Sequence, residues 1–244
     1  TTEEEVVDSG LRYDLTVPLV RYYSNNAASL PSPFKALQMG NVWRADRPQR
    51  GRYRQFMQCD IDILGEPSNL AEIELILATT TTLGKLGFKN FQIRINERRI
   101  LKAMAAYSGF PEESYDSVFI TLDKMDKIGA ENVNAELREK GVSEEAIEKL
   151  QPILRLEGSN EEKLTRLQEV LKGSETGLKG VAELSTVFRY LNQLDIQTEV
   201  KLDLTLARGL SYYTGAIFEV KAKDVEIGSI TGGGRYDDLT GIFG

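Results

Sequence analysis

Residues 34–64 read FKALQMGNVWRADRPQRGRYRQFMQCDIDIL, and the architecture can be worked out from this stretch outward. It contains two extended runs, residues 34–43 and 52–64, and the polar segment 45–51 lies between them. Proline and glycine in that segment are typical of a loop. The pattern therefore predicts a long antiparallel hairpin.

The second run of the hairpin has two different faces. Apolar side chains alternate with polar ones, so Met57, Cys59, Ile61 and Ile63 share one face and Gln58, Asp60 and Asp62 share the other. A strand with an apolar back and an acidic front can form one wall of a polar pocket.

Outward from the hairpin, further helices and strands follow from local patterns. Residues 11–16 are expected to be extended, with Asp14 and Thr16 on one side, and Thr16 is expected to cap a helix over residues 17–25. Residues 69–86 carry apolar side chains at helical spacing, and residues 91–95 form a strand.

A block of short charged helices follows, over residues 97–195. Its middle part, residues 131–170, holds ten acidic and six basic side chains and no obvious site. Strand patterns return at 200–204, 212–220 and 226–231. We therefore expect an α+β protein whose discontinuous core, residues 1–96 and 196–244, is interrupted by a helical insertion.

Composition excludes several kinds of chemistry. The 244 residues include no histidine and one cysteine, Cys59. A Ser-His-Asp or Cys-His nucleophilic site, a His-ligated zinc site and a multi-Cys zinc site are therefore excluded, and we expect no structural metal. The net charge of -7 argues against a general binder of nucleic acids or membrane surfaces. With no long apolar stretch and a polar start, a cytoplasmic location with no membrane partner is expected.

The hairpin loop is rich in arginine. Five guanidiniums fall within eleven positions, at Arg44, Arg47, Arg50, Arg52 and Arg54. The planar guanidinium of arginine can donate hydrogen bonds to two phosphate oxygens at once. The cluster therefore favours a nucleoside triphosphate or an RNA backbone as the ligand. A solvated charged loop is the plainer interpretation. We favour the phosphate site, because Arg52 and Arg54 are expected to continue the strand face that carries Gln58 and Asp62.

Two further motifs allow close approach of a ligand to the backbone. Residues 207–215 read ARGLSYYTG, which combines an arginine with paired tyrosines, and residues 232–237 read GGGRYD. Core aromatic side chains are the preferred interpretation of the first motif taken alone, and a glycine-rich turn between strands explains the second equally well. Each signal is weak alone.

Four motifs occur together and in a fixed order. They are LRYDLTVP at 11–18, WRADRPQRGRYRQFMQCD at 43–60, RGLSYYTG at 208–215 and GGGRYD at 232–237. In this combination the chain closely resembles the histidyl-tRNA synthetases, a family of class II aminoacyl-tRNA synthetases. The resemblance implies an antiparallel β-sheet flanked by helices, a homodimer and a histidine-tRNA ligase. Such an enzyme uses ATP with Mg²⁺ to form histidyl-adenylate and then transfers histidine to tRNA(His).

The resemblance also implies which residues bind histidine. Those matching the family's α-ammonium site are Asp14, Leu15, Thr16 and Gln58. Those matching the imidazole site are Asp62, Tyr212 and Tyr213, and Gly233 with its glycine neighbours matches the pocket floor. Gln58 and Asp62 are four residues apart on a predicted strand, hence on one face and about 13 Å apart, a length that suits a whole amino acid.

For ATP, the resemblance implies three arginines. Arg44 matches the residue that binds the α-phosphate and the histidine carboxylate, and Arg52 the contact to the distal phosphates. Arg208 matches an arginine that faces Arg44 across the α-phosphate, so Arg44 and Arg208 are the expected catalytic residues. The family's chemistry needs no general base, because the attacking carboxylate is already ionised.

The chain departs from the family pattern in several places. By comparison with the family, the first motif is expected to precede residue 1, and half of the third motif and the anticodon-binding domain are expected to lie outside residues 1–244. Ser211 stands where the family commonly has aspartate. We therefore expect a catalytic core that is incomplete at both ends.

Two other functions fit a synthetase-like sequence. One is a regulatory subunit of ATP phosphoribosyltransferase that does not aminoacylate, and the other is a pseudo-synthetase module that senses uncharged tRNA. Proteins of both kinds are expected to lose catalytic side chains. We rank them below the ligase because the arginine loop and the Arg208 motif are both intact here.

Overall fold

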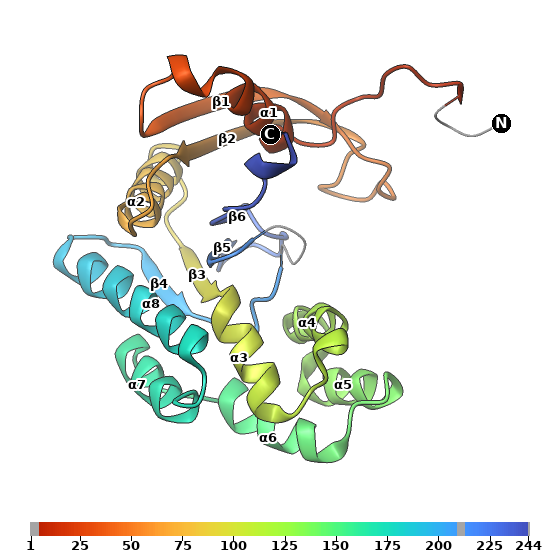
Figure 1. The fold of residues 1–244 in the computed structure, drawn as a ribbon, viewed down its shortest axis with the longest axis vertical. Helices are drawn as coiled ribbons and strands as arrows, with labels where there is room; N and C mark the ends of the chain where they lie inside the picture. The colour runs from red at the N-terminus through yellow and green to blue at the C-terminus, as the bar shows by residue number, and fades with distance from the viewer. Residues whose placement is uncertain (1–4, 209–212, 244) are drawn as a thin grey trace. The chain divides into compact units, whose positions relative to one another are not determined.

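The structure is a computed structural model that describes residues 5–208 and 213–243. The chain divides into two compact units. The first unit is Thr1–Ala71 with Asp238–Gly244, and the second is Glu72–Asp237. The ribbon in Figure 1 shows the elements of both units in chain order.

The first unit contains the predicted hairpin. Strands β1 (Phe34–Trp43) and β2 (Gln55–Leu64) pair antiparallel along their whole length, with Trp43 opposite Gln55. The hairpin prediction is confirmed, but β2 begins three residues later than expected. Residues 52–54 belong to the loop, so the prediction that Arg52 and Arg54 continue the β2 face is wrong.

The loop leaves the strands because its tip forms a small turn of its own. Gln49 and Arg52 exchange two backbone hydrogen bonds of 3.2 and 2.9 Å, and Gly51 between them has φ of +77°. That backbone conformation is open to glycine at little cost. Beyond the hydrogen bond of 2.8 Å from the Arg44 N–H to the Arg54 carbonyl, this local turn takes the place of pairing between the two strands.

Helix α1 (Thr16–Asn26) follows the first motif. Thr16 is the first residue of the helix rather than its cap, and Leu15 at the cap position has helical ψ. The Asp14 carboxylate accepts a hydrogen bond of 3.3 Å from the Val17 backbone N–H. The expectation of an extended segment with Asp14 and Thr16 on one side, ending in a Thr16 cap, is therefore wrong, and Asp14 fills the capping role because its carboxylate reaches a free N–H of the first turn.

Two short 3₁₀ turns complete the first unit. The turn η2 (Ala27–Ser29) follows α1 directly, and η4 (Thr240–Ile242) lies near the end of the chain. The Ser24 hydroxyl in α1 donates a hydrogen bond of 3.4 Å to the Thr240 carbonyl. This contact ties the last residues of the chain to the N-terminal helix.

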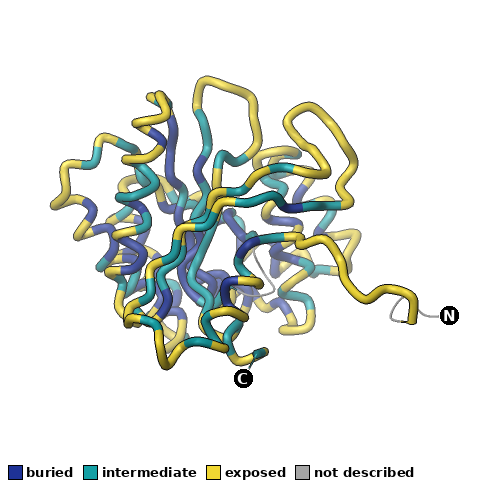
Figure 2. The backbone as a smooth tube through the Cα atoms, turned by 90° about the horizontal axis from the view of Figure 1, so that it is seen from above, coloured by how far each residue is buried: buried dark blue, intermediate teal, exposed yellow. Residues whose placement is uncertain are grey.

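The two faces of β2 are those predicted, but the polar face is the more covered one. Gln58, Asp60 and Asp62 are half-buried, whereas Met57 is 69% exposed and Ile61 is 40% exposed. In Figure 2 the same alternation of partly buried and exposed residues runs along the hairpin, and the N-terminal segment is exposed. The acidic face is covered because residues before α1 lie on it, as described below.

The second unit contains a four-stranded sheet with the order β4-β3-β5-β6. Its strands are β3 (Phe91–Glu97), β4 (Glu199–Leu202), β5 (Ala216–Ala222) and β6 (Thr231–Gly234). Strand β4 is parallel to β3, and the other two pairs are antiparallel. The expectation of a mixed α+β fold rich in antiparallel strands is confirmed.

The last predicted strand is displaced. We expected a strand over residues 226–231, but β6 begins at Thr231 and continues through Gly232, Gly233 and Gly234. The glycines form a strand because β5 supplies regular backbone partners along them. Local sequence indicated a turn here, and tertiary pairing overrode it.

Helices occupy residues 70–85 and most of residues 98–193. Their bounds are α2 (Leu70–Lys85), α3 (Arg98–Ser108), α4 (Tyr115–Leu122), α5 (Met125–Glu139), α6 (Glu144–Leu154), α7 (Asn160–Val170) and α8 (Glu175–Gln193), with a 3₁₀ turn η3 at Glu112–Ser114. Ser143 caps α6, because its hydroxyl accepts a hydrogen bond from the Ala146 N–H.

The core of the second unit lies between the sheet and its helices. Helices α3 and α8 pack against each other, and α8 also contacts β3 (Figure 1). Ile93 and Ile95 of β3 are almost fully buried, as are Ile100 and Leu101 of α3. These helices belong to the same compact unit as the sheet, and a separate insertion domain over residues 97–195 stays a prediction.

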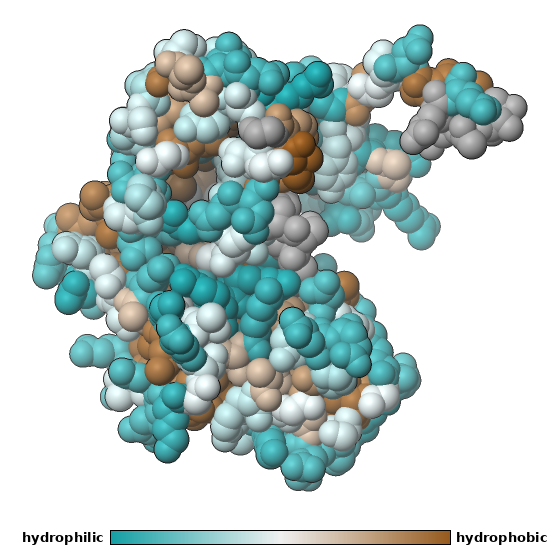
Figure 3. Space-filling view, viewed as in Figure 1, coloured by the Kyte–Doolittle hydropathy of each residue, from teal (hydrophilic) through white to brown (hydrophobic). Residues whose placement is uncertain are grey.

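The surface of the helical block is mostly polar. In Figure 3 hydrophilic residues predominate over α4 to α7, and small apolar areas interrupt them. Within residues 5–208 and 213–243, no helix has the length and apolar character needed to cross a bilayer.

Candidate active site

The expected site residues divide between the two compact units, and each group is described by itself. The first unit holds Asp14, Leu15, Thr16, Arg44, Arg52, Gln58 and Asp62, and the second holds Arg208, Tyr213 and Gly233. Tyr212 lies outside the described residues.

In the first unit, side chains and backbone hold the segment before α1 against β1. The Trp43 N–H donates to the Arg12 carbonyl at 2.9 Å, and Arg12 Nε donates to the Asn41 carbonyl at 2.7 Å. Farther along β1, Gln38 Nε2 donates to the carbonyl of the buried Leu15 at 3.1 Å. These three bonds place residues 12–15 over the polar face of the hairpin.

A glycine in β1 allows this close approach. A Cβ at Gly40 would lie 2.6 Å from Arg12 Nη2 and 3.6 Å from a Leu15 methyl group. Gly40 is the cross-strand partner of Gln58, so the Arg12 side chain lies over the strand pair that carries this expected histidine contact. Gln38 and Gly40 were not among the expected site residues, although the hairpin register places both on the polar face.

Three carboxylates gather on the polar face, from Asp14, Asp60 and Asp62. Burial raises the pKa of the Asp60 carboxyl, and the negative charges of Asp62 and Asp14 raise it further, while Arg44 acts in the opposite direction. Like charges this close make the surface favourable for a cation. Asp60 was placed on the acidic face but not among the expected site residues.

Gln58 contributes an acceptor that has no donor. Its Oε1 atom is buried and receives no hydrogen bond from any described residue. Buried polar atoms are nearly always hydrogen bonded, and leaving one unpaired costs about 1–3 kcal/mol. Gln58 is therefore suited to accept a hydrogen bond from a ligand.

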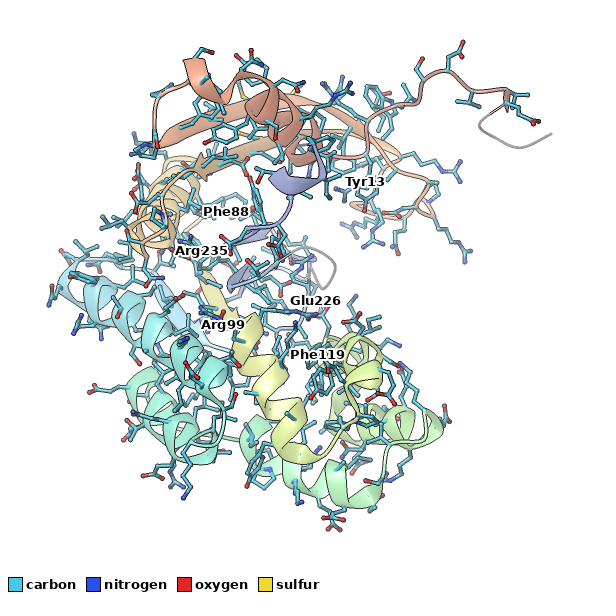
Figure 4. The ribbon with its side chains drawn as sticks, viewed as in Figure 1. Tyr13, Phe88, Arg99, Phe119, Glu226 and Arg235 are labelled. Carbon is cyan, nitrogen blue, oxygen red and sulfur yellow. The ribbon has the colours of Figure 1, made fainter. Side chains whose placement is uncertain are left out.

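Arg44 lies directly after β1, beside the segment that precedes α1. Its Nε donates to the Tyr13 carbonyl at 3.4 Å, and its guanidinium carbon lies 4.4 Å from the centre of the Tyr13 ring and 5.1 Å from that of Phe56. Tyr13 is labelled in Figure 4. The structure thus places Arg44 close enough to Asp60 to oppose the rise in the pKa of its carboxyl, whereas Arg52 is exposed at the loop tip.

In the second unit, Arg208 is tethered to the β5–β6 region. Its Nη1 donates to the Ser229 hydroxyl at 2.8 Å and lies 3.4 Å from Glu219 Oε1. The preceding residue is tied to the end of α4, because the Ala207 N–H donates to the Asp123 carboxylate at 3.3 Å. Both sides of this tether lie far from Arg208 in sequence, so local patterns could not reveal them.

The three glycines of β6 differ in what surrounds them. A Cβ at Gly232 would lie 2.9 Å from Arg208 Nη1, and one at Gly234 would lie 2.6 Å from the Ala216 carbonyl and 2.8 Å from the Tyr213 ring. Gly233 has open space at the corresponding position. Two of the glycines therefore make room for expected site residues of this chain, and at the third no described atom lies within 4 Å of the position that a Cβ would take.

Each group of expected site residues has its own chemistry. The first offers carboxylates, an unpaired amide oxygen and an arginine, which suits a zwitterion. The second offers a tethered arginine near Gly232 and, near Gly234, an aromatic ring, which together with the bare glycine backbone suits an anion. Among residues 5–208 and 213–243, no cluster of three or more Cys, Asp or Glu side chains is placed to hold a metal ion.

An α+β fold with these motifs defines a catalytic domain of the class II aminoacyl-tRNA synthetases. The sequence model of the family described as Histidyl-tRNA synthetase matches residues 6–244. The chain belongs to the histidyl-tRNA synthetase family.

Individual relatives agree with this assignment. The chain is 56% identical to a histidine-tRNA ligase of Phocaeicola vulgatus over 97% of its own length and 52% of that protein. The crystal structure of histidyl-tRNA synthetase from Nostoc sp. PCC 7120 has a TM-score of 0.84 and 34% identity, over 95% of this chain and 54% of that one. The chain thus spans about half the length of the curated relatives it matches.

A more distant structure shares the fold. The crystal structure of an ATP phosphoribosyltransferase regulatory subunit/histidyl-tRNA synthetase from Bacillus halodurans C has a TM-score of 0.81 and 24% identity, over 95% of this chain and 59% of that one. At that identity the likeness concerns the fold alone.

Proposed function

We propose that the protein containing this chain is a histidine-tRNA ligase. It would activate histidine with ATP, bound as its Mg²⁺ complex, and then transfer the histidyl group to tRNA(His). Membership of the family supports this activity. The observation that carries it is the acidic strand face of the first unit, where the buried Gln58 Oε1 receives no hydrogen bond from the residues that the structure describes.

On the amino-acid side, the acidic face would hold the cationic parts of histidine. Asp14, Leu15, Thr16 and Gln58 form the proposed α-ammonium site, and the raised pKa of Asp60 supports a local excess of negative charge. Asp62, Tyr212 and Tyr213 are proposed to read the imidazole, with Gly233 as the floor of the pocket. An analogue without ring nitrogens would leave such groups unpaired, which is a strong basis for selection.

On the ATP side, three arginines would hold the phosphates. Arg44 is proposed to bind the α-phosphate and the histidine carboxylate, and Arg52 the distal phosphates. The ionised carboxylate oxygen attacks the α-phosphorus, the bond to the bridging oxygen of pyrophosphate breaks, and pyrophosphate leaves. Arg208 would stabilise the charge of the pentacoordinate phosphorus, as fixed cations do in phosphoryl transfer.

The test is histidine-dependent exchange of pyrophosphate into ATP, measured with the full-length protein. We expect exchange with histidine and background rates with other amino acids. Arg208→Ala should reduce exchange by roughly 100-fold or more, the usual scale for loss of one preorganised charge donor. A change under about threefold would remove Arg208 from the mechanism. No exchange, or equal exchange with other amino acids, would contradict the ligase and favour a regulatory or tRNA-sensing role.

The proposal extends to a homodimer in the cytoplasm, as the family resemblance implies. Sedimentation of the full-length protein at micromolar concentration should give the mass of two chains. A monomer at concentrations where exchange is observed would exclude the dimer as a requirement for activation.

A further inference from the structure

Arg208 is held by one nitrogen of its guanidinium. Nη1 meets the Ser229 hydroxyl and Glu219 Oε1, whereas Nε and Nη2 make no hydrogen bond to a described residue. The side chain is 39% exposed. A single tether of this kind fixes the position of the cation while the rest of the planar fork stays available to phosphate oxygens.

The acceptor that holds Arg208 is itself rigidly placed. Glu219 lies in the middle of β5, opposite Arg94 of β3 on one side and Gly232 of β6 on the other. Its side chain is 13% exposed. An acceptor at the centre of a paired strand has little freedom to move, so it can define where the Arg208 guanidinium rests.

Ser229 links the two charged groups. Its hydroxyl donates its one proton to Glu219 Oε1 and accepts the Arg208 Nη1 hydrogen bond on a lone pair. This direction is the only one that satisfies all three groups, because arginine cannot accept and an ionised carboxylate cannot donate. The Ser229 hydroxyl therefore bridges the Glu219 carboxylate and the Arg208 guanidinium.

Gly232 supplies the space for this arrangement. It is the cross-strand neighbour of Glu219, and a Cβ there would approach Arg208 Nη1 to 2.9 Å and the Phe218 carbonyl to 3.4 Å. A side chain at this position would push the guanidinium away from its acceptor.

We propose that Glu219 and Ser229 are positioning residues that hold the Arg208 guanidinium in place for the activation step. This inference rests on the proposed function. A cation lowers the barrier most when it is already oriented before charge develops, and a free arginine side chain loses about 2 kcal/mol of rotamer entropy when it is fixed. Glu219, Ser229 and Gly232 fix the Arg208 guanidinium in the folded protein, so its rotamer entropy is lost on folding rather than during the reaction.

The primary test uses pyrophosphate exchange by the full-length protein. Glu219→Gln keeps the shape but removes the charge, and Ser229→Ala removes the linking hydroxyl. We expect kcat to fall about tenfold in Glu219→Gln and at least threefold in Ser229→Ala, with KM for histidine within twofold of the wild type. The matched control is Glu226→Gln, a substitution of an exposed glutamate on the same β5–β6 connection (Figure 4), which should change neither value by more than twofold.

A double substitution separates positioning from general stability. In an Arg208→Ala background, adding Glu219→Gln should cause no further loss, because the group that Glu219 positions is gone. A further tenfold loss there would show that Glu219 acts in another way and would overturn the inference.

The two proposals fail in different ways. Absence of histidine-dependent exchange in the wild type would contradict the ligase itself. Normal wild-type exchange together with unchanged kcat in Ser229→Ala and Glu219→Gln would overturn only the positioning role. If Glu219→Gln does not fold, the kcat of Ser229→Ala decides, since that smaller change leaves the paired strand intact.

Discussion

Glu72 of α2 accepts two hydrogen bonds from Arg235, which directly follows β6. Arg235 Nε lies 2.5 Å from Glu72 Oε1, and Nη2 lies 2.7 Å from Oε2. Glu72 is 2% exposed, and its hydrogen bonds raise the pKa of the Arg235 guanidinium against the opposing effect of burial. The Arg235 backbone also bonds to Thr214 and Ala216. The pair therefore anchors the end of the glycine strand and the start of β5 to a helix.

The first prediction concerns this buried pair. Arg235→Met should lower the free energy of unfolding by about 3 kcal/mol or more, because it leaves the Glu72 carboxylate buried without its partner. Adding Glu72→Leu should recover most of the loss, since no buried charge then remains. Urea unfolding of the two variants and the wild type measures both effects. A double variant less stable than Arg235→Met alone would contradict this account.

The second prediction concerns the contact between α8 and α3. A Cβ at Gly180 would overlap Glu97 Oε2 and lie 3.2 Å from an Ile100 side-chain carbon. Glu97 is fully buried, caps α3 and pairs with Arg99, which Figure 4 labels, so it cannot move away freely. Gly180→Ala should therefore cost about 1–3 kcal/mol by overpacking.

Gly173→Ala is the matched control for that helix contact. Gly173 has open space where its Cβ would be, and its φ is not positive. Its substitution should leave the melting temperature unchanged or slightly higher. Equal shifts in melting temperature for the two alanine variants would argue against close packing at Gly180.

The third prediction is a pH dependence at Asp60. Because its pKa is raised above the ordinary value of 3.8, the folded protein holds the Asp60 proton more tightly than the unfolded chain does. The contribution to stability is therefore fully present below 3.8 and is lost as the pH rises through the raised pKa. Asp60→Asn should be more stable than the wild type above that pKa and lose this advantage at lower pH. Melting temperatures of both proteins from pH 3 to pH 8 test this, and parallel curves would be inconsistent with it.

The fourth prediction concerns the hydrogen bond from Gln38 to the Leu15 carbonyl. Gln38→Ala removes one of the bonds that hold residues 12–15 over the acidic face. If that segment binds the α-ammonium, KM for histidine should rise about fivefold, the equivalent of roughly 1 kcal/mol for one hydrogen bond. Gln55→Ala, at the exposed start of β2, is the control and should leave KM unchanged. The idea is wrong if both variants shift KM equally.

Local patterns in the sequence were sufficient for many elements. The hairpin was predictable because alternation along β2 has a period of two and the loop contains proline and glycine. Ser143 was predictable as a cap because serine before acidic residues suits a helix start. Thr16 was taken for a cap because Asp14 and Thr16 lie two residues apart and either side chain can fill that role, and in the folded protein Asp14 fills it.

Motif identity and order along the chain were enough to indicate the family, the mixed α+β class and the residues expected to bind histidine and ATP. Which side chains support those residues depends on packing in three dimensions. Glu72 meets Arg235 across 163 positions and Ser229 meets Arg208 across 21. Such contacts depend on strand register and helix packing, which bring together residues that are far apart in the sequence. No local sequence pattern indicates them. For the same reason, only the fold revealed that the glycines of β6 form a strand and leave room for Arg208 and Tyr213.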